Sequence, residues 1–491
     1  MNKGEVRVAI AEHDELFIGN RWVPSDAKGR IDVRSASTEE VIGRVPDATK
    51  SDVDRAVAAA REAFDKGPFP RMAPEERADA IRRLSEALKK RAPAIAEVIS
   101  RQNGCPTRES VGTQVFAATM VLDIHADMTK SFNWSEERPG AFGNPVRVGR
   151  LPVGVCAGII PWNVPLFIMA MKLGPALAAG CTVVLKPSPE TPLDPYLLGE
   201  AILEAELPPG VVNIVAAGRE TSEYLVSHPG VDKVSFTGSS ATGRRVASLA
   251  GEGLKRCTLE LGGKSAAILL DDFDLESHGA ALLSAGLLNN GQACAAQTRI
   301  LAPRSRYKEI VEGLGALVAA KKVGDAMDPA TEIGPLVAER QRDRVLGYLE
   351  DGKKAGARAV CGGGRPRQLP KGWFIEPTLF ADVDNAMKIA REEIFGPVLC
   401  VIPYDGDDQA IAIANDSPYG LSGSVWSQDV DRAAKVASQL RTGTVPINSP
   451  MLLDFRSPFG GFKQSGIGRE LGPEGIAPFT EYRSIILPPR A

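Results

Sequence analysis

The chain has 491 residues, of which 44% are hydrophobic and 24% are charged. This composition is typical of soluble globular proteins, and the length suggests roughly two to four domains. The 58 basic and 61 acidic side chains give a net charge of -3, and no run of five like charges occurs. Nothing in the charge distribution therefore predicts binding to nucleic acid or to an acidic membrane surface.

The cysteines and histidines point away from disulfides and metals. The seven cysteines are odd in number and widely spaced, and the four histidines stand in no metal-binding motif. This pattern favours a reducing compartment and predicts neither a disulfide framework nor a metal site. The first 17 residues lack the apolar core of a secretory signal, and no apolar run reaches the roughly 20 residues of a membrane span. The expected location is the cytoplasm.

The first part of the chain predicts short strands followed by helices. Residues 18–46 have a strand-and-turn pattern, and Ser51, with Asp54 three residues later, resembles a helix cap. The predicted helices cover about residues 51–64, 74–90, 92–103 and 110–130.

From residue 153 onward, continuous apolar strands alternate with helices, which predicts parallel sheets covered on both faces. Two doubly wound α/β domains joined near residues 261–263 fit this pattern best. Residues 131–150 and the tail 480–489 break the rhythm, because both are polar or strand-like and rich in turns. They form either an arm that pairs with another subunit, since an edge strand seeks a partner, or a disordered insertion.

Cys294 is a candidate nucleophile. It lies in Gly-Gln-Ala-Cys-Ala-Ala, between a predicted helix and a strand, and its small neighbours leave the sulfur uncrowded. A reactive cysteine needs such an accessible loop position. The alternative is a buried, inert cysteine, which is the usual state of this residue.

Two further polar residues follow predicted strands. Glu260 ends an apolar strand before Gly262 and Gly263, and an apolar setting raises a carboxyl pKa toward general-base use. The alternative is a surface carboxylate. Asn163, in Pro-Trp-Asn-Val-Pro, follows another strand and has an amide that can donate to a developing oxyanion. The alternative for Asn163 is a helix N-cap.

Several other segments are suited to a nucleotide. Gly238 and Gly243 flank a predicted strand-to-helix turn, where free N–H groups and the helix dipole favour a phosphate. Lys186 ends a strand, and Glu393 precedes Phe395 in Glu-Glu-Ile-Phe-Gly-Pro-Val. A structural turn, a salt bridge or a core position explains each of these equally well when taken singly.

Together these segments resemble the aldehyde dehydrogenase superfamily. Six motifs occur in the family's order over essentially the whole chain: PWN, FTGS with a later glycine, ELGGK, GQ-x-C, EEIFGPV and PFGG-x-K-x-SG-x-GRE. The resemblance implies oxidation of an aldehyde to a carboxylic acid with NAD, through a thiohemiacetal and a thioester on a cysteine. It also implies a Rossmann-like cofactor domain over 1–130 and 151–259, a catalytic domain over 260–470, and an oligomerisation arm formed by 131–150 and 471–491.

The resemblance assigns roles to individual residues. Cys294 is the nucleophile, Glu260 the base for deacylation and Asn163 part of the oxyanion hole, while Lys172 and Glu470 match positions of a proton relay. The expected cofactor-binding residues are Trp162, Lys186, Ser188, Gly238, Ser239, Leu261, Glu393 and Phe395. The expected substrate-tunnel residues are Val164, Phe167, Ile168, Met171, Leu453 and Phe459.

These assignments narrow the substrate and the cofactor. The tunnel positions are all apolar, which favours an aliphatic or aromatic aldehyde, whereas Arg456 nearby leaves a semialdehyde acid open. The ribose-binding glutamate of many NAD-preferring relatives is replaced by Pro189, with Glu190 one residue later, so NAD is expected and NADP remains open. The resemblance implies a homodimer or a homotetramer.

Competing functions are a dehydrogenase that releases acyl-coenzyme A and a structural or binding protein that has kept the fold. Family members of the first kind lack the glutamate found at Glu260, and loss of Cys294 or Glu260 would mark the second. Both residues are present, so hydrolysis of the thioester is favoured. Hydrolysis of activated esters by the same cysteine is an expected side reaction.

Overall fold

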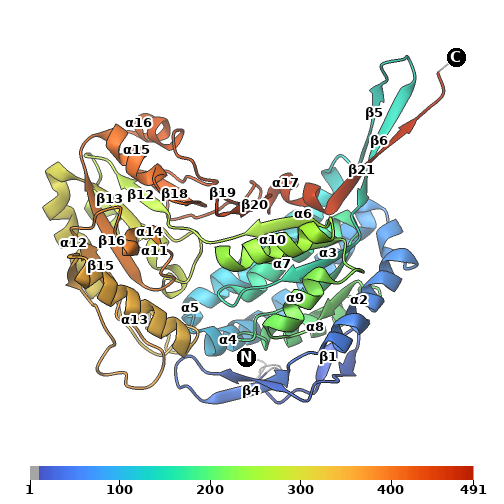
Figure 1. The fold of residues 1–491 in the computed structure, drawn as a ribbon, viewed down its shortest axis with the longest axis horizontal. Coiled ribbons are helices and arrows are strands. Elements are labelled where there is room, and N and C mark those ends of the chain that lie inside the picture. Colours follow the sequence, from blue (N-terminus) through green and yellow to red (C-terminus); the bar gives the residue numbers. More distant parts are fainter. Residues whose placement is uncertain (1–9, 490–491) are drawn as a thin grey trace.

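The computed structural model describes residues 10–489 (Figure 1). The expectation about a signal segment falls mostly on residues 1–9, which lie outside this range. Within the described range, no helix is both long enough and apolar enough to cross a membrane.

An eight-stranded sheet forms the larger part of the molecule. Its five central strands are parallel, and antiparallel strands complete both edges. In sheet order the strands are β2 (Trp22–Pro24), β1 (Glu15–Phe17), β9 (Val212–Ile214), β8 (Thr182–Lys186), β7 (Val155–Ile159), β10 (Lys233–Thr237), β11 (Arg256–Glu260) and β20 (Gly466–Ile467).

Helices cover both faces of this sheet because its central strands are apolar on both sides. One face packs against α3 (Pro74–Lys90), α4 (Ala92–Asn103), α6 (Ala117–Ser131), α7 (Pro165–Ala179) and α8 (Asp194–Glu204). The other face packs against α2 (Lys50–Asp65), α9 (Arg219–Ser227) and α10 (Ser240–Glu252). α7 is buried along its whole length.

A six-stranded, mostly parallel sheet forms the smaller part. Its order is β14 (Arg358–Cys361), β15 (Thr378–Ala381), β16 (Val398–Tyr404), β13 (Arg299–Pro303), β12 (Ala266–Leu269) and β18 (Gly423–Trp426). α11 (Leu275–Leu287) and α12 (Tyr307–Ala319) cover one face. The other face carries α13 (Glu339–Lys354), α14 (Lys388–Arg391), α15 (Asp407–Asn415) and α16 (Val430–Ala437). The predicted fold class, two α/β units with helices on both sheet faces, is confirmed; the residue limits of the domains stay a prediction.

An arm of three antiparallel strands projects from the larger part and carries the C-terminal end of the chain (Figure 1). β6 (Pro145–Pro152) lies between β21 (Thr480–Ile486) and β5 (Ser135–Pro139). The strand character expected for both segments is confirmed, so the first segment is not a disordered insertion. Which surface the arm contacts in an assembly stays a prediction.

The remaining short elements are β3 (Arg30–Arg34), β4 (Val41–Pro46), α5 (Thr107–Ser110), β17 (Tyr419–Gly420), β19 (Phe462–Lys463) and α17 (Gly472–Ile476). The first two form a hairpin-like pair, and β17 pairs with β19.

Two local predictions need correction. The cap of α2 is Thr49 rather than Ser51, because Thr49 and Asp52 bond reciprocally to each other's backbone N–H. The single helix expected over 110–130 contains a π-helical segment, Val111–Phe116, before α6. The periodicity of apolar residues does not distinguish a π-helical turn from an α-helical one.

Candidate active site

The predicted catalytic residues meet at one edge of the larger sheet. β7, β8, β10 and β11 are parallel, so the segments that follow them gather at their carboxyl ends. A cavity of about 170 Å³ lies there, and Asn163, Glu260, Cys294 and Glu393 all line it. Residues separated by up to 230 positions in the chain therefore share one space.

Cys294 lies in a loop after α11. The chain turns there through Asn289 and Asn290, both in the left-handed region with φ of 52° and 60°. Cys294 is partly exposed and borders the cavity, which does not fit an inert core cysteine. Burial of the thiol raises the pKa of Cys294 to about 12, and the nearby carboxylates of Glu393 and Glu260 add to the effect. Near neutral pH the sulfur therefore holds its proton until a base removes it.

Glu260 is the last residue of β11 and is almost fully buried, which rules out a surface carboxylate. Burial raises the pKa of Glu260 well above its usual value, and the charge of Glu470 raises it further. Neither carboxylate oxygen has a hydrogen-bond partner among the described residues. A side chain at Gly460 would come within 2.6 Å of Glu260 Oε1, so glycine is needed there.

Lys172 and Glu470 form a buried ion pair behind Glu260. Lys172 Nζ lies 2.8 Å from Glu470 Oε1, and both side chains are 2% exposed or less. The ammonium also donates to Ser235 Oγ at 3.1 Å and to Thr237 Oγ1 at 2.9 Å. The two predicted relay positions are thus in direct contact.

Asn163 does not cap α7, since the cap position is Val164 and no side chain caps there. Its side chain is 5% exposed and borders the cavity, with Nδ2 donating to Gln292 O at 2.9 Å. The amide carries a second hydrogen that this bond does not use. Asn163 can therefore donate to an oxygen beside Cys294.

A second cavity of about 520 Å³ adjoins the first and shares Trp162, Gly238 and Ser239 with it. Ser239 is the N-cap of α10 and accepts from Thr242 N at 3.3 Å, and both residues line this cavity, so the N-terminal end of the helix lies at its wall. Lys186 lines this cavity, and burial lowers the pKa of its ammonium to about 8. This cavity is large, has a helix N-terminus at its wall and adjoins the cavity of Cys294. These features suit an elongated dinucleotide.

Glu393 lines the cavity of Cys294. Its Oε1 accepts from Gly263 N at 3.0 Å, and burial raises the pKa of its carboxyl to about 7. A side chain at Gly262 would meet Glu393 Oε2 at 2.5 Å. Trp162 and Phe395 contact edge to face with ring centroids 5.2 Å apart. Of the other predicted cofactor residues, Leu261 lines the smaller cavity and Ser188 the larger one.

The predicted tunnel residues form one apolar group. All six belong to the hydrophobic cluster that also packs against Cys294: Val164, Phe167, Ile168, Met171, Leu453 and Phe459. Only Ile168 lines the cavity of Cys294, and Met171 is fully buried. Phe455 was not predicted, yet its ring centroid lies 5.7 Å from that of Phe167. Arg456 is exposed and lines neither cavity.

Other residues of the cavities also escaped sequence reasoning. Arg340, Gln341 and Arg344 come from α13 and line the cavity of Cys294. Glu190 reaches the larger cavity and contacts Ser188 and Arg340. Burial alone would raise the pKa of Glu190, but the Arg340 guanidinium and the Ser188 hydroxyl hold it below its usual value. Arg340 belongs to no motif. Glu190 lies one residue after the position at which many NAD-preferring relatives carry the ribose-binding glutamate.

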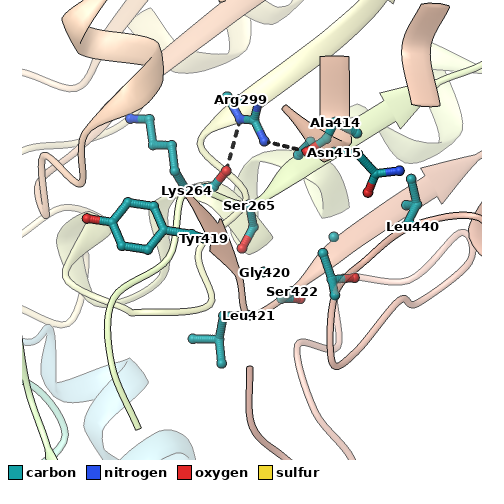
Figure 2. Close-up of a pocket in the computed structure, with 13 residues that line it drawn as sticks. Lys264, Ser265, Arg299, Ala414, Asn415, Tyr419, Gly420, Leu421, Ser422 and Leu440 are labelled. Carbon is teal, nitrogen blue, oxygen red and sulfur yellow. Dashed lines mark hydrogen bonds between the residues drawn. The ribbon is translucent and has the colours of Figure 1, made fainter. Parts of the chain in front are cut away.

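A third pocket, shown in Figure 2, shares no lining residue with these two cavities. It lies beside Ser265 and Ser422, and the Arg299 guanidinium donates there to Lys264 O and Ala414 O at 2.9 Å each. Its volume of about 10 Å³ is the space that one water molecule needs. It is too small for an organic substrate.

Comparison with known proteins agrees with this geometry. Residues 22–485 match the model of the aldehyde dehydrogenase family. Geranial dehydrogenase from Castellaniella defragrans is 49% identical over 478 residues, which are 97% of this chain and 99% of that protein. An aldehyde dehydrogenase from Mycobacterium tuberculosis, solved with NAD+, is 50% identical with a TM-score of 0.96 over 98% of this chain and 99% of its own. A cysteine-to-alanine mutant of an aldehyde dehydrogenase from Pseudomonas syringae, solved with NAD+ and octanal, is 40% identical with a TM-score of 0.93 over 96% of each chain.

Proposed function

The chain belongs to the aldehyde dehydrogenase family, and we propose that it oxidises an apolar aldehyde to the carboxylic acid through a thioester on Cys294. It is an NAD-dependent aldehyde dehydrogenase. The observation that carries the proposal is the convergence of Cys294, Asn163 and Glu260 on one cavity. A nucleophile, an oxyanion donor and a buried carboxyl are the groups that such a reaction needs.

In the first half-reaction Cys294 adds to the carbonyl carbon of the aldehyde. The thiol must lose its proton before it attacks, since its pKa lies near 12, and two carboxyls, Glu260 and Glu393, line the same cavity. Asn163 Nδ2 and the backbone N–H of Cys294 stabilise the oxyanion of the thiohemiacetal. NAD, when bound along Lys186, Ser239 and Glu393, supplies the acceptor for the hydride.

In the second half-reaction a water molecule hydrolyses the thioester on Cys294. Glu260 takes a proton from that water, because its high pKa makes its carboxylate a strong base. The buried pair of Lys172 and Glu470 lies behind Glu260 and accepts the proton in turn. The presence of Glu260 favours hydrolysis over transfer of the acyl group to coenzyme A.

The substrate proposed is a neutral aliphatic or aromatic aldehyde. The six tunnel positions are apolar and belong to the hydrophobic cluster against which Cys294 packs, and Arg456 lies exposed outside both cavities. The names of two relatives support the same class, since one acts on geranial and another binds octanal. A semialdehyde acid would place its carboxylate among the apolar tunnel side chains, where an unpaired charge is costly.

For the cofactor, we propose that Glu190 replaces the ribose carboxylate missing at Pro189. Glu190 lines the larger cavity, and its lowered pKa keeps it ionised at neutral pH. A carboxylate there repels the 2′-phosphate of NADP, which favours NAD.

For the whole chain, we propose a cofactor domain over 1–130 and 151–259 and a catalytic domain over 260–470. The arm of 131–150 and 471–491 would then join subunits in a homodimer or homotetramer.

The test is a panel of hexanal, geranial, benzaldehyde and succinate semialdehyde, each with NAD and with NADP, followed by the absorbance of the reduced nicotinamide. We expect the highest kcat/KM for an apolar aldehyde with NAD. A preference for succinate semialdehyde would refute the apolar tunnel, and a preference for NADP would refute the role of Glu190. Unchanged acid formation on addition of coenzyme A, without acyl-coenzyme A, is expected if the thioester is hydrolysed.

A further inference from the structure

The backbone carbonyl of Asn163 accepts hydrogen bonds from three side-chain amides. Asn103 Nδ2 donates at 2.8 Å, Asn289 Nδ2 at 2.9 Å and Gln114 Nε2 at 3.2 Å. The three come from the end of α4, from the turn after α11 and from the π-helical segment, and all are fully buried. A carbonyl oxygen has two lone pairs, so three donors more than fill its capacity to accept hydrogen bonds. The position of Asn163 O is therefore fixed from three sides.

Asn289 differs from the other two donors because it also reaches the loop of Cys294. Its Nδ2 lies 3.4 Å from Gln292 O, the same oxygen that accepts from Asn163 Nδ2 at 2.9 Å. One amide group therefore bridges the backbone of Asn163 and the backbone two residues before Cys294. Within residues 10–489, Asn103 and Gln114 make no hydrogen bond to that loop, so their amides hold only the Asn163 side.

The backbone of Asn289 is itself fixed. Its φ of 52° lies in the left-handed region, which asparagine tolerates better than most residues. Asn289 N donates to Glu109 Oε1 at 2.6 Å, and Asn289 O accepts from Gln292 N at 2.9 Å. The bridging amide thus starts from an anchored turn and has little freedom to move.

We propose that Asn289 is a positioning residue that sets the separation between the Asn163 amide and Cys294, and that it thereby controls stabilisation of the oxyanion. The inference rests on the roles proposed above for Cys294 and Asn163. Loss of the Asn289 amide removes one link between Asn163 O and Gln292 O, so the separation of the two carbonyls can change. Misplacement of catalytic groups by about 1 Å costs on the order of 100-fold in rate.

The test variant is Asn289→Gly, because glycine adopts the left-handed conformation and removes the side chain that carries the amide. The matched control is Asn290→Gly. Asn290 is also fully buried and left-handed, with φ of 60°, but its amide bonds to Gly104 O, Pro335 O and Gly334 N, away from Asn163 and Cys294. The two variants lose the same chemical group from adjacent positions, so general destabilisation affects both.

Three measurements separate positioning from folding. The first is kcat/KM with hexanal and NAD, for which we expect a loss of about 10- to 100-fold in Asn289→Gly and less than about threefold in Asn290→Gly. The second is the rate of Cys294 alkylation by iodoacetamide, a displacement that forms no oxyanion, which should change less than about threefold in either variant. The third is the loss of kcat/KM that Asn289→Gly causes when Asn163 is already alanine. This loss should be less than about threefold, because the two residues act as one unit.

The inference is overturned if Asn289→Gly retains wild-type kcat/KM, if Asn290→Gly loses as much, or if the loss is as large in the Asn163→Ala background. An equal fall of the Cys294 alkylation rate and of kcat/KM in Asn289→Gly would also overturn it, because that result indicates a disordered Cys294 loop. Failure of the proposed function is a different result: Asn163→Ala alone would then keep full kcat/KM, or Cys294→Ala would remain active.

Discussion

At the residue scale, burial shifts two acids in the same direction around one cavity. It raises the pKa of Cys294 to about 12 and raises the pKa of Glu260 well above its ordinary value. Both groups therefore favour their protonated forms, and the carboxylate of Glu260, once formed, is basic enough to compete for a proton in this apolar setting. The buried Lys172–Glu470 pair is the route that we propose for the proton taken up by Glu260.

The high thiol pKa gives a prediction for alkylation of Cys294 in the enzyme without cofactor. The thiolate is the reactive form, and an unperturbed cysteine has a pKa of about 8.5. The rate of labelling by iodoacetamide should therefore be well below that of a free cysteine peptide near neutral pH. It should continue to rise at pH values above those at which the peptide reaches its plateau. Peptide mass mapping measures the rate, and a plateau of the Cys294 rate below about pH 8 would contradict the raised pKa.

Sequence reasoning succeeds for residues whose role follows from local setting. The apolar strand before Glu260 predicts a buried carboxyl, and Glu260 is buried in the structure, where burial raises its pKa. It fails where contacts depend on distant elements. Arg340 carries no motif, and its contact with Glu190 spans 150 residues. The amides of Asn103, Gln114 and Asn289 meet only after three elements have packed.

At the scale of elements, a short turn places the nucleophile. α11 ends at Leu287, and the left-handed Asn289 and Asn290 redirect the chain toward Cys294. Gly291 completes the turn with φ of 73°, and a Cβ there would lie 2.1 Å from Gly396 O. Glu109 on α5 anchors the turn from the other side through Asn289 N. The helix that the sequence predicts before Cys294 therefore ends at Leu287, ahead of this turn.

The anchor on α5 predicts a pH-dependent stability. Burial raises the pKa of Glu109 from 4.5 to about 7, so the folded protein binds this proton more tightly than the unfolded chain does. The stabilisation linked to Glu109 is therefore complete below about pH 4.5 and is lost as the pH rises through about 7. Glu109→Gln keeps an oxygen for Asn289 N and carries no charge. The Tm of Glu109→Gln minus the Tm of the wild type should therefore increase by a few degrees as the pH rises from about 5 to about 8.

Thermal unfolding followed by circular dichroism measures this difference, with Glu75→Gln, an exposed carboxylate on α3, as the control. The control should show no such gain. A Tm difference for Glu109→Gln that is constant or falls with pH would exclude a buried carboxyl with a raised pKa at this position.

At the scale of the whole molecule, the two α/β parts were predictable because their apolar strands alternate with helices in the sequence. The choice between a dimer and a tetramer was not predictable, since it depends on surfaces that carry no motif. β21 lies at an edge of the arm and exposes 61% of Tyr482 and 72% of Ile486, which are on the same face of the strand. Exposed apolar side chains on an edge strand are typical of an interface.

If the arm joins subunits, the substitution Ile486→Asp should weaken their association. The chain has a mass of 52.2 kDa, and light scattering after size exclusion should give at least twice this value for the wild type. Ile486→Asp should shift the mass toward that of the single chain, because a carboxylate replaces apolar contact. Val430→Asp changes a side chain of α16 that is 56% exposed and lies outside the arm, and it should leave the mass unchanged. A wild-type monomer at micromolar concentration would remove the assembly role of the arm.

The central claim is that a thioester forms on Cys294 and that Glu260 is needed to hydrolyse it. Rapid mixing of Glu260→Gln with NAD and hexanal, followed by absorbance of the reduced nicotinamide and intact-protein mass spectrometry, tests this claim directly. The account predicts a burst of at most one equivalent of reduced cofactor, a slow steady state, and one hexanoyl group on Cys294 that is absent in Cys294→Ala. Full steady-state turnover by Glu260→Gln, or a burst without an acyl group on Cys294, would contradict it.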